Sequence, residues 1–457
     1  MTGPADTRPD QGAPEGSRGW RSLFPILSWL PAYDRRLLAG DAGAAAIVTV
    51  MLVPQSLAYA MLAGLPPETG LYASILPLFL YTIFGTSGSL AVGPVAVISL
   101  MTAAAGGAVA EAGSAEYRMA AVTLALLSGA ILLSMALLRL GRFAGLLSPA
   151  VVCGFTAAAG LLIAAGQMRH VLGIPLPGDT LPDLLAAMGA GIGGLNVYTT
   201  GLGAGCLTFL VWSRQRAKPL LRRLGVSPWA ADLAARASPL LAIGMAIGAV
   251  LLFGLEDRGV PVVGGIPPGM PRFGVPSLDP TLCLQLLAPA ALISLVGYIE
   301  SLSIAQTLAA RAQGSVRENQ ELVALGAANV AAAVSGSFPI TGGLARSAVN
   351  ADAGARTPMA GTLTAAGIAA ASFTIAPLLQ HLPQSVLAAT IIVAVLALVD
   401  PGAMKATFRR SRRDAAVMTA TMAGVLCLGV ETGLAAGLGM SLLVERQAFR
   451  TVFGRLA

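Results

Sequence analysis

Residues 53–101 read VPQSLAYAMLAGLPPETGLYASILPLFLYTIFGTSGSLAVGPVAVISLM and contain one charged residue, Glu68. No Lys or Arg occurs between Arg36 and Arg118. A helix needs about 20 mostly apolar residues to cross a bilayer, so this window predicts two spanning helices and a shorter third segment. The whole chain of 457 residues is 55% hydrophobic and 11% charged, whereas soluble domains are roughly a quarter charged. We therefore expect an all-α integral membrane protein.

Outward from this stretch, further apolar windows bring the predicted number of membrane segments to fourteen. With a cytoplasmic N-terminus and alternating sides, most of the 29 Lys and Arg residues fall at cytoplasmic ends, as the positive-inside rule requires. The outer loops hold four: Arg118, Arg169, Arg258 and Arg272. This predicts a multi-pass protein of a cell inner membrane with both termini cytoplasmic. The net charge of +7 then reflects orientation and lipid headgroup contact, not nucleic-acid binding.

The two halves of the chain show a faint internal similarity. The segment QSLAYA from Gln55 resembles ESLSIA from Glu300, and Pro94 precedes Pro339 by the same offset of 245 residues. Seven segments in each half would place the second half upside down, which predicts two inverted seven-segment repeats. Coincidence between two Ala-rich apolar sequences is the alternative.

Two segments read as half-helices that begin inside the membrane. They are GPVAVISLM, opening at Gly93-Pro94, and FPITGGLARSAVN, opening at Phe338-Pro339, the third and tenth segments. A helix that begins there leaves its first N–H groups unpaired and carries a partial positive charge at that end. Two such ends facing each other would bind a small anion with backbone groups.

Arg346 and Glu300 are charged residues within predicted membrane segments, which makes them candidates for function. Arg346 would add a full positive charge near the helix ends; neutralising a structural carboxylate is its alternative role. Glu300 would gain and lose a proton during transport; a permanent ion pair with Arg346 and a polar helix-packing contact are its alternatives.

The matching position to Glu300 in the first half is Gln55, which can donate to an anion without adding charge. Tyr59 lies one turn further on the same helical face, where a ligand contact and core packing remain equally open. Asp41 and Asp352 lie near segment ends and are interpreted as interfacial. His170 and His381 are expected in solvated outer loops.

Motifs of other protein classes are missing from the sequence. It contains no GxxxxGK[ST] phosphate loop and no HExxH. The four cysteines lie far apart in apolar stretches, and we interpret them as apolar side chains. We expect no metal and no cofactor, and no acid, base and nucleophile set for a membrane-embedded enzyme.

The stretch quoted above, together with GYIESLSIAQTLAAR, FPITGGLARSAVNADAGARTPMAG and VLAATIIVAVLALVD, resembles the sulfate permease (SulP) family of anion transporters. The similarity extends from about Leu37 to Glu445. It implies a core domain that bears the half-helices and a gate domain often used for dimer contact. The domains implied are 1–36 as a cytoplasmic tail, 37–142 and 280–378 as core, 143–258 and 382–448 as gate, and 449–457 as a short cytoplasmic tail.

The resemblance also implies an anion site between the third and tenth segments. By position, its contacts would be Gln55, Tyr59, Val95, Ala96, Leu344, Ala345 and Arg346, with Glu300 as the proton-coupling carboxylate. Two departures are expected: Ala345 stands where many members have Ser, and the chain carries no STAS domain after its last helix.

These observations predict a secondary transporter of small anions that works by alternating access, with sulfate carried together with protons as the leading assignment. Bicarbonate, chloride and dicarboxylates remain open as substrates, and sodium remains open as the coupling ion. An uncoupled anion channel on the same fold and a membrane-embedded enzyme are the rival classes, and a related nucleobase carrier is disfavoured by Arg346.

Overall fold

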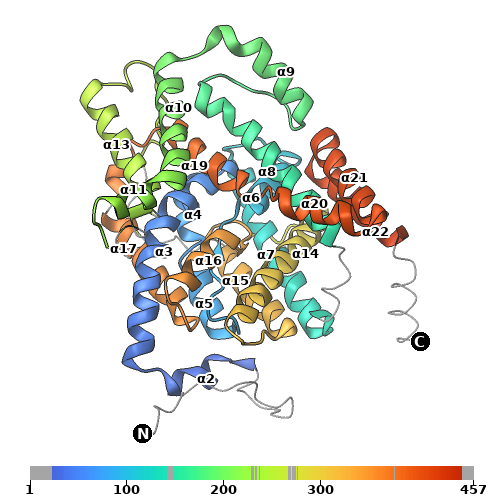
Figure 1. The fold of residues 1–457 in the computed structure, drawn as a ribbon. Coiled ribbons are helices and arrows are strands. Elements are labelled where there is room, and N and C mark those ends of the chain that lie inside the picture. Colours follow the sequence, from blue (N-terminus) through green and yellow to red (C-terminus); the bar gives the residue numbers. More distant parts are fainter. Residues whose placement is uncertain are drawn as a thin grey trace.

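The computed structural model describes residues 23–444 except for 142–148, 228–230, 232–233, 236, 266–268, 270–273, 275 and 375. Residues 1–22 and 449–457, which belong to the predicted tails, lie outside the described residues. Figure 1 shows a bundle made almost entirely of helices. In chain order the elements are α2 Ile26–Trp29, η1 Leu30–Ala32, α3 Arg35–Leu62, α4 Glu68–Tyr72, α5 Leu76–Phe84, β1 Val92–Gly93, α6 Ala96–Gly107, α7 Ala115–Leu137, α8 Pro149–Leu172, α9 Leu181–Gly191, η3 Ile192–Gly194, α10 Val197–Trp212, η4 Ser213–Ala217, α11 Lys218–Arg223, α13 Ser238–Phe253, α14 Pro280–Arg311, α15 Glu318–Val334, β2 Thr341–Gly342, α16 Leu344–Asp352, α17 Met359–Thr374, α18 Ala376–Leu379, α19 Gln384–Leu396, α20 Pro401–Arg410, α21 Arg412–Leu428 and α22 Val430–Val444.

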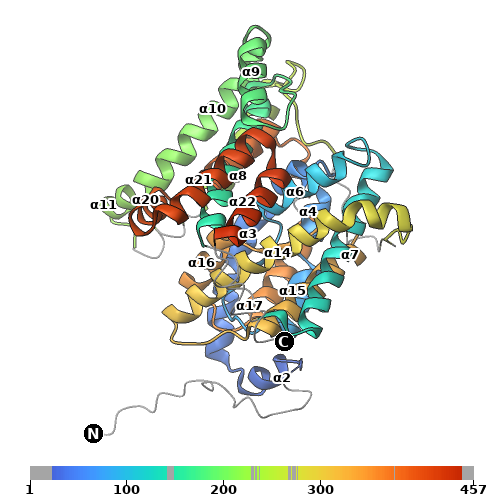
Figure 2. The same ribbon diagram turned by 90° about the vertical axis from the view of Figure 1, so that its right-hand side faces the viewer.

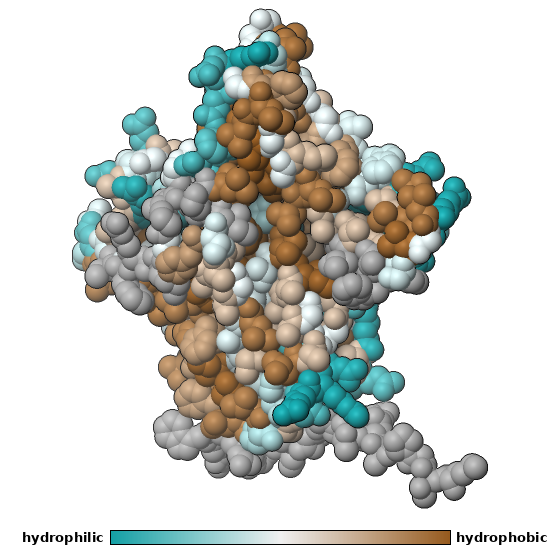
Figure 3. Space-filling model, turned by 90° about the vertical axis from the view of Figure 1, so that its left-hand side faces the viewer, coloured by the Kyte–Doolittle hydropathy of each residue, from teal (hydrophilic) through white to brown (hydrophobic). Residues whose placement is uncertain are grey.

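The described helices have the length and composition of membrane-spanning segments. Five stretches are long and apolar enough to cross a bilayer: Arg35–Leu62, Ala115–Leu137, Ala150–Leu172, Pro280–Arg311 and Gln384–Arg410. Shorter apolar helices accompany them, among them α6, α13 and α17. Figure 3 shows apolar side chains covering much of one side of the molecule, with hydrophilic ones collected toward its ends and projections. A helical membrane fold is therefore confirmed.

The long helices begin at side-chain caps that the sequence provides. Asp34 accepts hydrogen bonds from the first amides of α3, Ser114 does so for α7 and Asp279 for α14. Such caps satisfy amides that have no partner within the helix. Helices α3, α5, α7, α14, α15 and α17 pack against one another in one group, and α8, α10, α19, α21 and α22 form a second group. Figures 1 and 2 show both groups from perpendicular directions.

A two-stranded sheet joins the two halves of the chain. Strand β1 pairs antiparallel with β2, with Val92 opposite Gly342 and Gly93 opposite Thr341. Each strand lies directly before a short helix, β1 before α6 and β2 before α16. The sequence did not predict this short pairing, because it joins backbone segments far apart in the chain; the fold remains helical, as predicted.

Three other expectations need correction. The second half-helix begins at Leu344 and not at Pro339, because the residues between them form β2 and its approach. Asp41 is wholly buried instead of interfacial, since it is hydrogen-bonded to the segment before α17. His170 lies in the last turn of α8, partly buried, and not in a solvated loop.

Candidate functional site

The N-termini of α6 and α16 meet at the small sheet. Because β1 and β2 are antiparallel and each leads into its helix, the two helices leave the sheet in opposite directions with their first turns close together. The N-cap residues are Val95 for α6 and Gly343 for α16, and neither supplies a side-chain cap. Uncapped amides at two adjacent helix ends form a region of positive potential.

The guanidinium of Arg346 lies across this junction. Arg346 is in the first turn of α16 and only 3% exposed. Its Nε donates to the carbonyl oxygen of Ala91 at 3.2 Å, and its Nη1 donates to that of Pro94 at 3.2 Å. Its Nη2 is buried and has no hydrogen-bond partner. A buried guanidinium nitrogen without a partner is costly, so this atom points to an acceptor that arrives from outside the protein.

Two glycines allow the guanidinium to sit this close to both chains. A Cβ atom built on Gly93 would lie 3.3 Å from Nη2 of Arg346, and one built on Gly343 would lie 3.1 Å from the same atom. Gly93 also has φ +151°, a conformation that other residues rarely adopt. The two glycines therefore leave room around the unpaired nitrogen.

Glu300 and Tyr59 are the electrostatic neighbours of Arg346. Glu300, on α14, is half-buried, and its Oε2 is buried without a hydrogen-bond partner. Within the described part of the chain no ion pair joins Glu300 to Arg346, so the permanent ion pair weighed for these residues is not formed. Tyr59, on α3, is 8% exposed and belongs to the main hydrophobic core.

The remaining residues of the predicted site surround this junction on three helices. Gln55 is half-buried on α3, one turn before Tyr59. Val95 and Ala96 are buried at the start of α6. Leu344 is 46% exposed and Ala345 is also exposed at the start of α16. The residues at the start of α6 are thus buried, whereas the first two residues of α16 are exposed.

Polar side chains that the sequence did not single out hold the approach to α16. Asn329, on α15, accepts a hydrogen bond from the amide of Ile340 at 2.9 Å and donates to its carbonyl at 3.0 Å. Ser301, next to Glu300, accepts from the amide of Gly342 at 2.8 Å. Thr341 donates to the carbonyl of Gly297 at 2.6 Å. The sequence signal for this cluster is Asn329, a polar residue in a largely apolar helix. Its backbone partner, Ile340, cannot be predicted from the sequence.

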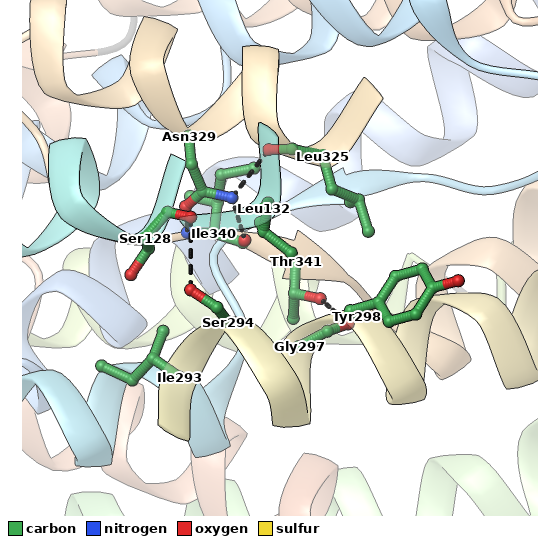
Figure 4. Close-up of a pocket in the computed structure, with 10 residues that line it drawn as sticks. All are labelled: Ser128, Leu132, Ile293, Ser294, Gly297, Tyr298, Leu325, Asn329, Ile340 and Thr341. Atoms are coloured by element: carbon green, nitrogen blue, oxygen red, sulfur yellow. Dashed lines mark hydrogen bonds between the residues drawn. The ribbon is translucent and has the colours of Figure 1, made fainter. Parts of the chain in front are cut away.

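Figure 4 shows Asn329, Ile340, Thr341 and Gly297 among the residues around a small cavity between α7, α14, α15 and β2. Its volume of about 10 Å³ is near the minimum that can hold one water molecule. Neither Arg346 nor Glu300 lines it. This cavity is therefore part of the support behind the site and not the site itself.

The chain is similar in sequence to a known protein family. The model of the Sulfate permease family matches residues 38–421. This chain belongs to that family. It is 34% identical over 424 residues to "Sulfate transporter 4.1, chloroplastic" of Arabidopsis thaliana, covering 92% of this chain and 60% of the relative. It is 33% identical over 428 residues to "Probable sulfate transporter Rv1739c" of Mycobacterium tuberculosis, covering 93% of this chain and 73% of the relative.

The sulfate permease fold is also shared with solved structures. Murine Slc26a9, an anion transporter in the inward-facing state, matches with a TM-score of 0.83 at 23% identity over 96% of this chain and 74% of that chain. The transmembrane domain of the cyanobacterial bicarbonate transporter BicA matches with a TM-score of 0.74 at 20% identity over 90% of this chain and 98% of that chain. These relatives and solved structures are transporters and not enzymes. This chain spans about 60% of the length of the Arabidopsis relative.

Proposed function

We propose that this sulfate permease family member is a secondary active transporter that binds a small anion between the N-termini of α6 and α16, with sulfate as the first candidate substrate. One observation carries the proposal: Nη2 of Arg346 is buried and unpaired beside two uncapped helix ends. An anion there would accept from Nη2 and from first-turn amides. Such charge-assisted hydrogen bonds are roughly twice as strong as neutral ones.

The proposed architecture has fourteen membrane segments in two inverted repeats. The segments are α3, α4 with α5, α6, α7, α8, α10 and α13 in the first repeat, and α14, α15, α16, α17, α19, α21 and α22 in the second. The first packing group is proposed as the core domain and the second as the gate domain, with homodimer contact through the gate. Alternating access would move the core, with its bound anion, against the gate in a cell inner membrane, with both termini cytoplasmic.

Glu300 is the proposed coupling group. Its Oε2 is buried and unpaired near Arg346, so a proton that binds there would remove a negative charge close to the anion. Protonation would therefore favour loading of a divalent anion, and the two would be carried together. A sodium ion near the carboxylate would have the same electrostatic effect.

Uptake of radiolabelled sulfate into proteoliposomes tests the proposal. We expect an inward proton gradient to drive accumulation above the external concentration. A sodium gradient in place of the proton gradient tests the other coupling ion, and competition by unlabelled bicarbonate, chloride and dicarboxylates ranks the substrates. Downhill movement without accumulation under either gradient would instead indicate an uncoupled channel. Failure of every anion to enter would exclude the proposed function.

A further inference from the structure

Two buried carboxylates lie away from the anion site and are used by no step proposed above. Asp41, on α3, and Glu321, on α15, are both 0% exposed. Burying a carboxylate is costly unless hydrogen bonds replace its water. Both carboxylates accept hydrogen bonds from loops that adjoin the half-helices.

Glu321 binds the loop that leads into the first half-helix. Its Oε1 accepts from the amide of Thr86 at 2.8 Å and from the hydroxyl of Thr86 at 2.5 Å. Its Oε2 accepts from the hydroxyl of Tyr81 at 2.7 Å. Thr86 lies between α5 and β1. The carboxylate therefore fixes the chain shortly before it enters the sheet and α6.

Asp41 binds the loop that leaves the second half-helix. Its Oδ1 accepts from the amides of Arg356 at 2.8 Å and Thr357 at 3.3 Å. Its Oδ2 accepts from the hydroxyls of Thr357 and Tyr33. Burial and the Asp41 carboxylate raise the pKa of Tyr33 to about 12, so this hydroxyl keeps its proton. This loop lies between α16 and α17.

The two loops also contact each other. Gly88 packs so closely on the carbonyl of Arg356 that a Cβ atom there would overlap it. Asn350, on α16, donates to the carbonyl of Ser89 at 3.1 Å. The contacts thus run without a break from α3 through both loops to α15. The loop before β1 therefore lies against the C-terminal end of α16, and β1 pairs with β2 at the N-terminal end of α16.

We infer that Asp41 and Glu321 are positioning residues for anion transport: they act as hydrogen-bond acceptors that clamp the two loops and so keep the N-termini of α6 and α16, with Arg346, in the geometry that binds the anion. The inference rests on the proposed function for its link to transport. Its structural part concerns the geometry alone and is tested without any anion.

Hydrogen–deuterium exchange of the purified full chain provides the structural readout, and sulfate uptake in proteoliposomes provides the functional one. The variants are Asp41→Ala and Glu321→Ala, with Asp41→Asn and Glu321→Gln as conservative rescues. An amide keeps an oxygen for the loop amides, while the neighbouring hydroxyls can turn to accept from its nitrogen. Glu318→Gln, one turn before Glu321 on the same helix, is the matched control.

We expect both Ala variants to raise exchange in peptides covering residues 86–93 and 353–357, and also 343–347 at the start of α16. We expect the KM for sulfate to rise about tenfold or more, the size of effect that loss of a charge-assisted hydrogen bond produces. The amide variants and Glu318→Gln should remain within about threefold of the unsubstituted protein, a difference near the usual worth of one neutral hydrogen bond.

Several outcomes would overturn the inference. Exchange that rises in the loops but not at residues 343–347 would show that the clamp does not reach the site. Amide variants as impaired as the Ala variants would show that the charge matters and not the acceptors. If the Ala variants do not fold, Thr86→Val and Thr357→Val each remove one hydroxyl that donates to a carboxylate and that also accepts from a backbone amide, of Arg317 and Met359 respectively. They should give the same pattern more weakly, and unchanged exchange in both would overturn the inference. If the unsubstituted protein transports no anion, the proposed function fails, and exchange alone still decides whether the clamp exists.

Discussion

Arg346 in the second half-helix donates a hydrogen bond to the carbonyl oxygen of Pro94, which precedes the first half-helix, over 3.2 Å. The same guanidinium donates to Ala91 and leaves Nη2 unpaired. One side chain therefore has two roles, of which the sequence predicts only the second. It joins the two halves of the chain, and it presents a charged donor to the site.

Arg346→Ala should abolish sulfate uptake, because it removes the charged donor and both hydrogen bonds to the first half. Arg346→Lys keeps the charge but loses the planar fork of donors with which Arg346 can contact two carbonyls and an anion at once. We therefore expect uptake at least about tenfold below the unsubstituted rate. Radiolabelled uptake in proteoliposomes measures both. Uptake by the Ala variant at the unsubstituted rate would remove Arg346 from the binding site.

Glu300→Gln should separate transport from pH. The amide resembles a carboxyl that is always neutral, so anion loading no longer waits for a proton. We expect exchange of internal for external sulfate to continue, while accumulation driven by a proton gradient is lost. Measuring both activities over acidic to neutral pH gives the test, and a pH response equal to that of the unsubstituted protein would contradict the assignment.

Gly343→Ala should weaken anion binding through Arg346. The new methyl group would lie 3.1 Å from Nη2, close enough to displace it. Gly93→Ala adds backbone strain because of its φ of +151°, at a cost of about 1–3 kcal/mol, so it should lower stability as well. Gly107→Ala, at the far end of α6, meets no atom within 4 Å and is the control. We expect a raised KM in the first two variants and an unchanged KM in the control.

Ala345→Ser should change the order of anion preference. Ala345 is exposed at the start of α16, so a hydroxyl there can donate to the bound anion without disturbing the core. A neutral hydrogen bond contributes about 0.5–1.5 kcal/mol, which is up to about tenfold in affinity. Competition against labelled sulfate by a series of anions measures the change. Identical competition curves for both proteins would show that this position does not contact the anion.

Asn329→Leu should destabilise the fold at the approach to α16. It leaves the amide and carbonyl of Ile340 buried without their side-chain partner. Each such group costs about 1–3 kcal/mol, so we expect a lower thermal unfolding midpoint. Ser134→Ala serves as the comparison, because Ser134 is exposed on α7 and its hydroxyl bonds only to its own helix. Equal midpoints for the two variants would contradict the supporting role of Asn329.

The helical part of the fold could be predicted because it depends on composition and on runs of apolar residues. The sheet could not be predicted, because Val92–Gly93 and Thr341–Gly342 are too short to show a strand pattern and pair across most of the chain. The predicted start of the second half-helix, at Pro339, is wrong because strand β2 could not be predicted. Pro339 marks where a helix can begin, whereas the pairing of β2 delays the start to Leu344.

The charged residues of the site could also be predicted, because Arg346 and Glu300 are charged residues within apolar segments. The partners of Arg346 were not, because they are backbone carbonyls that any residue carries. The prediction that Asp41 is interfacial is wrong for a related reason. A carboxylate near the end of a helix is normally solvated, and only the tertiary structure shows that the loop at Thr357 covers it.

The pairing of β1 with β2 has a consequence for biosynthesis. Residues of the first strand leave the ribosome long before those of the second, and contacts between distant parts of a chain form slowly. The first half of the protein thus enters the bilayer with the edge of β1 unpaired. The junction of the two half-helices does not exist until Gly342 has been inserted beside Val92. The junction of the two half-helices therefore forms only late in synthesis, after the first half has waited without its partner strand.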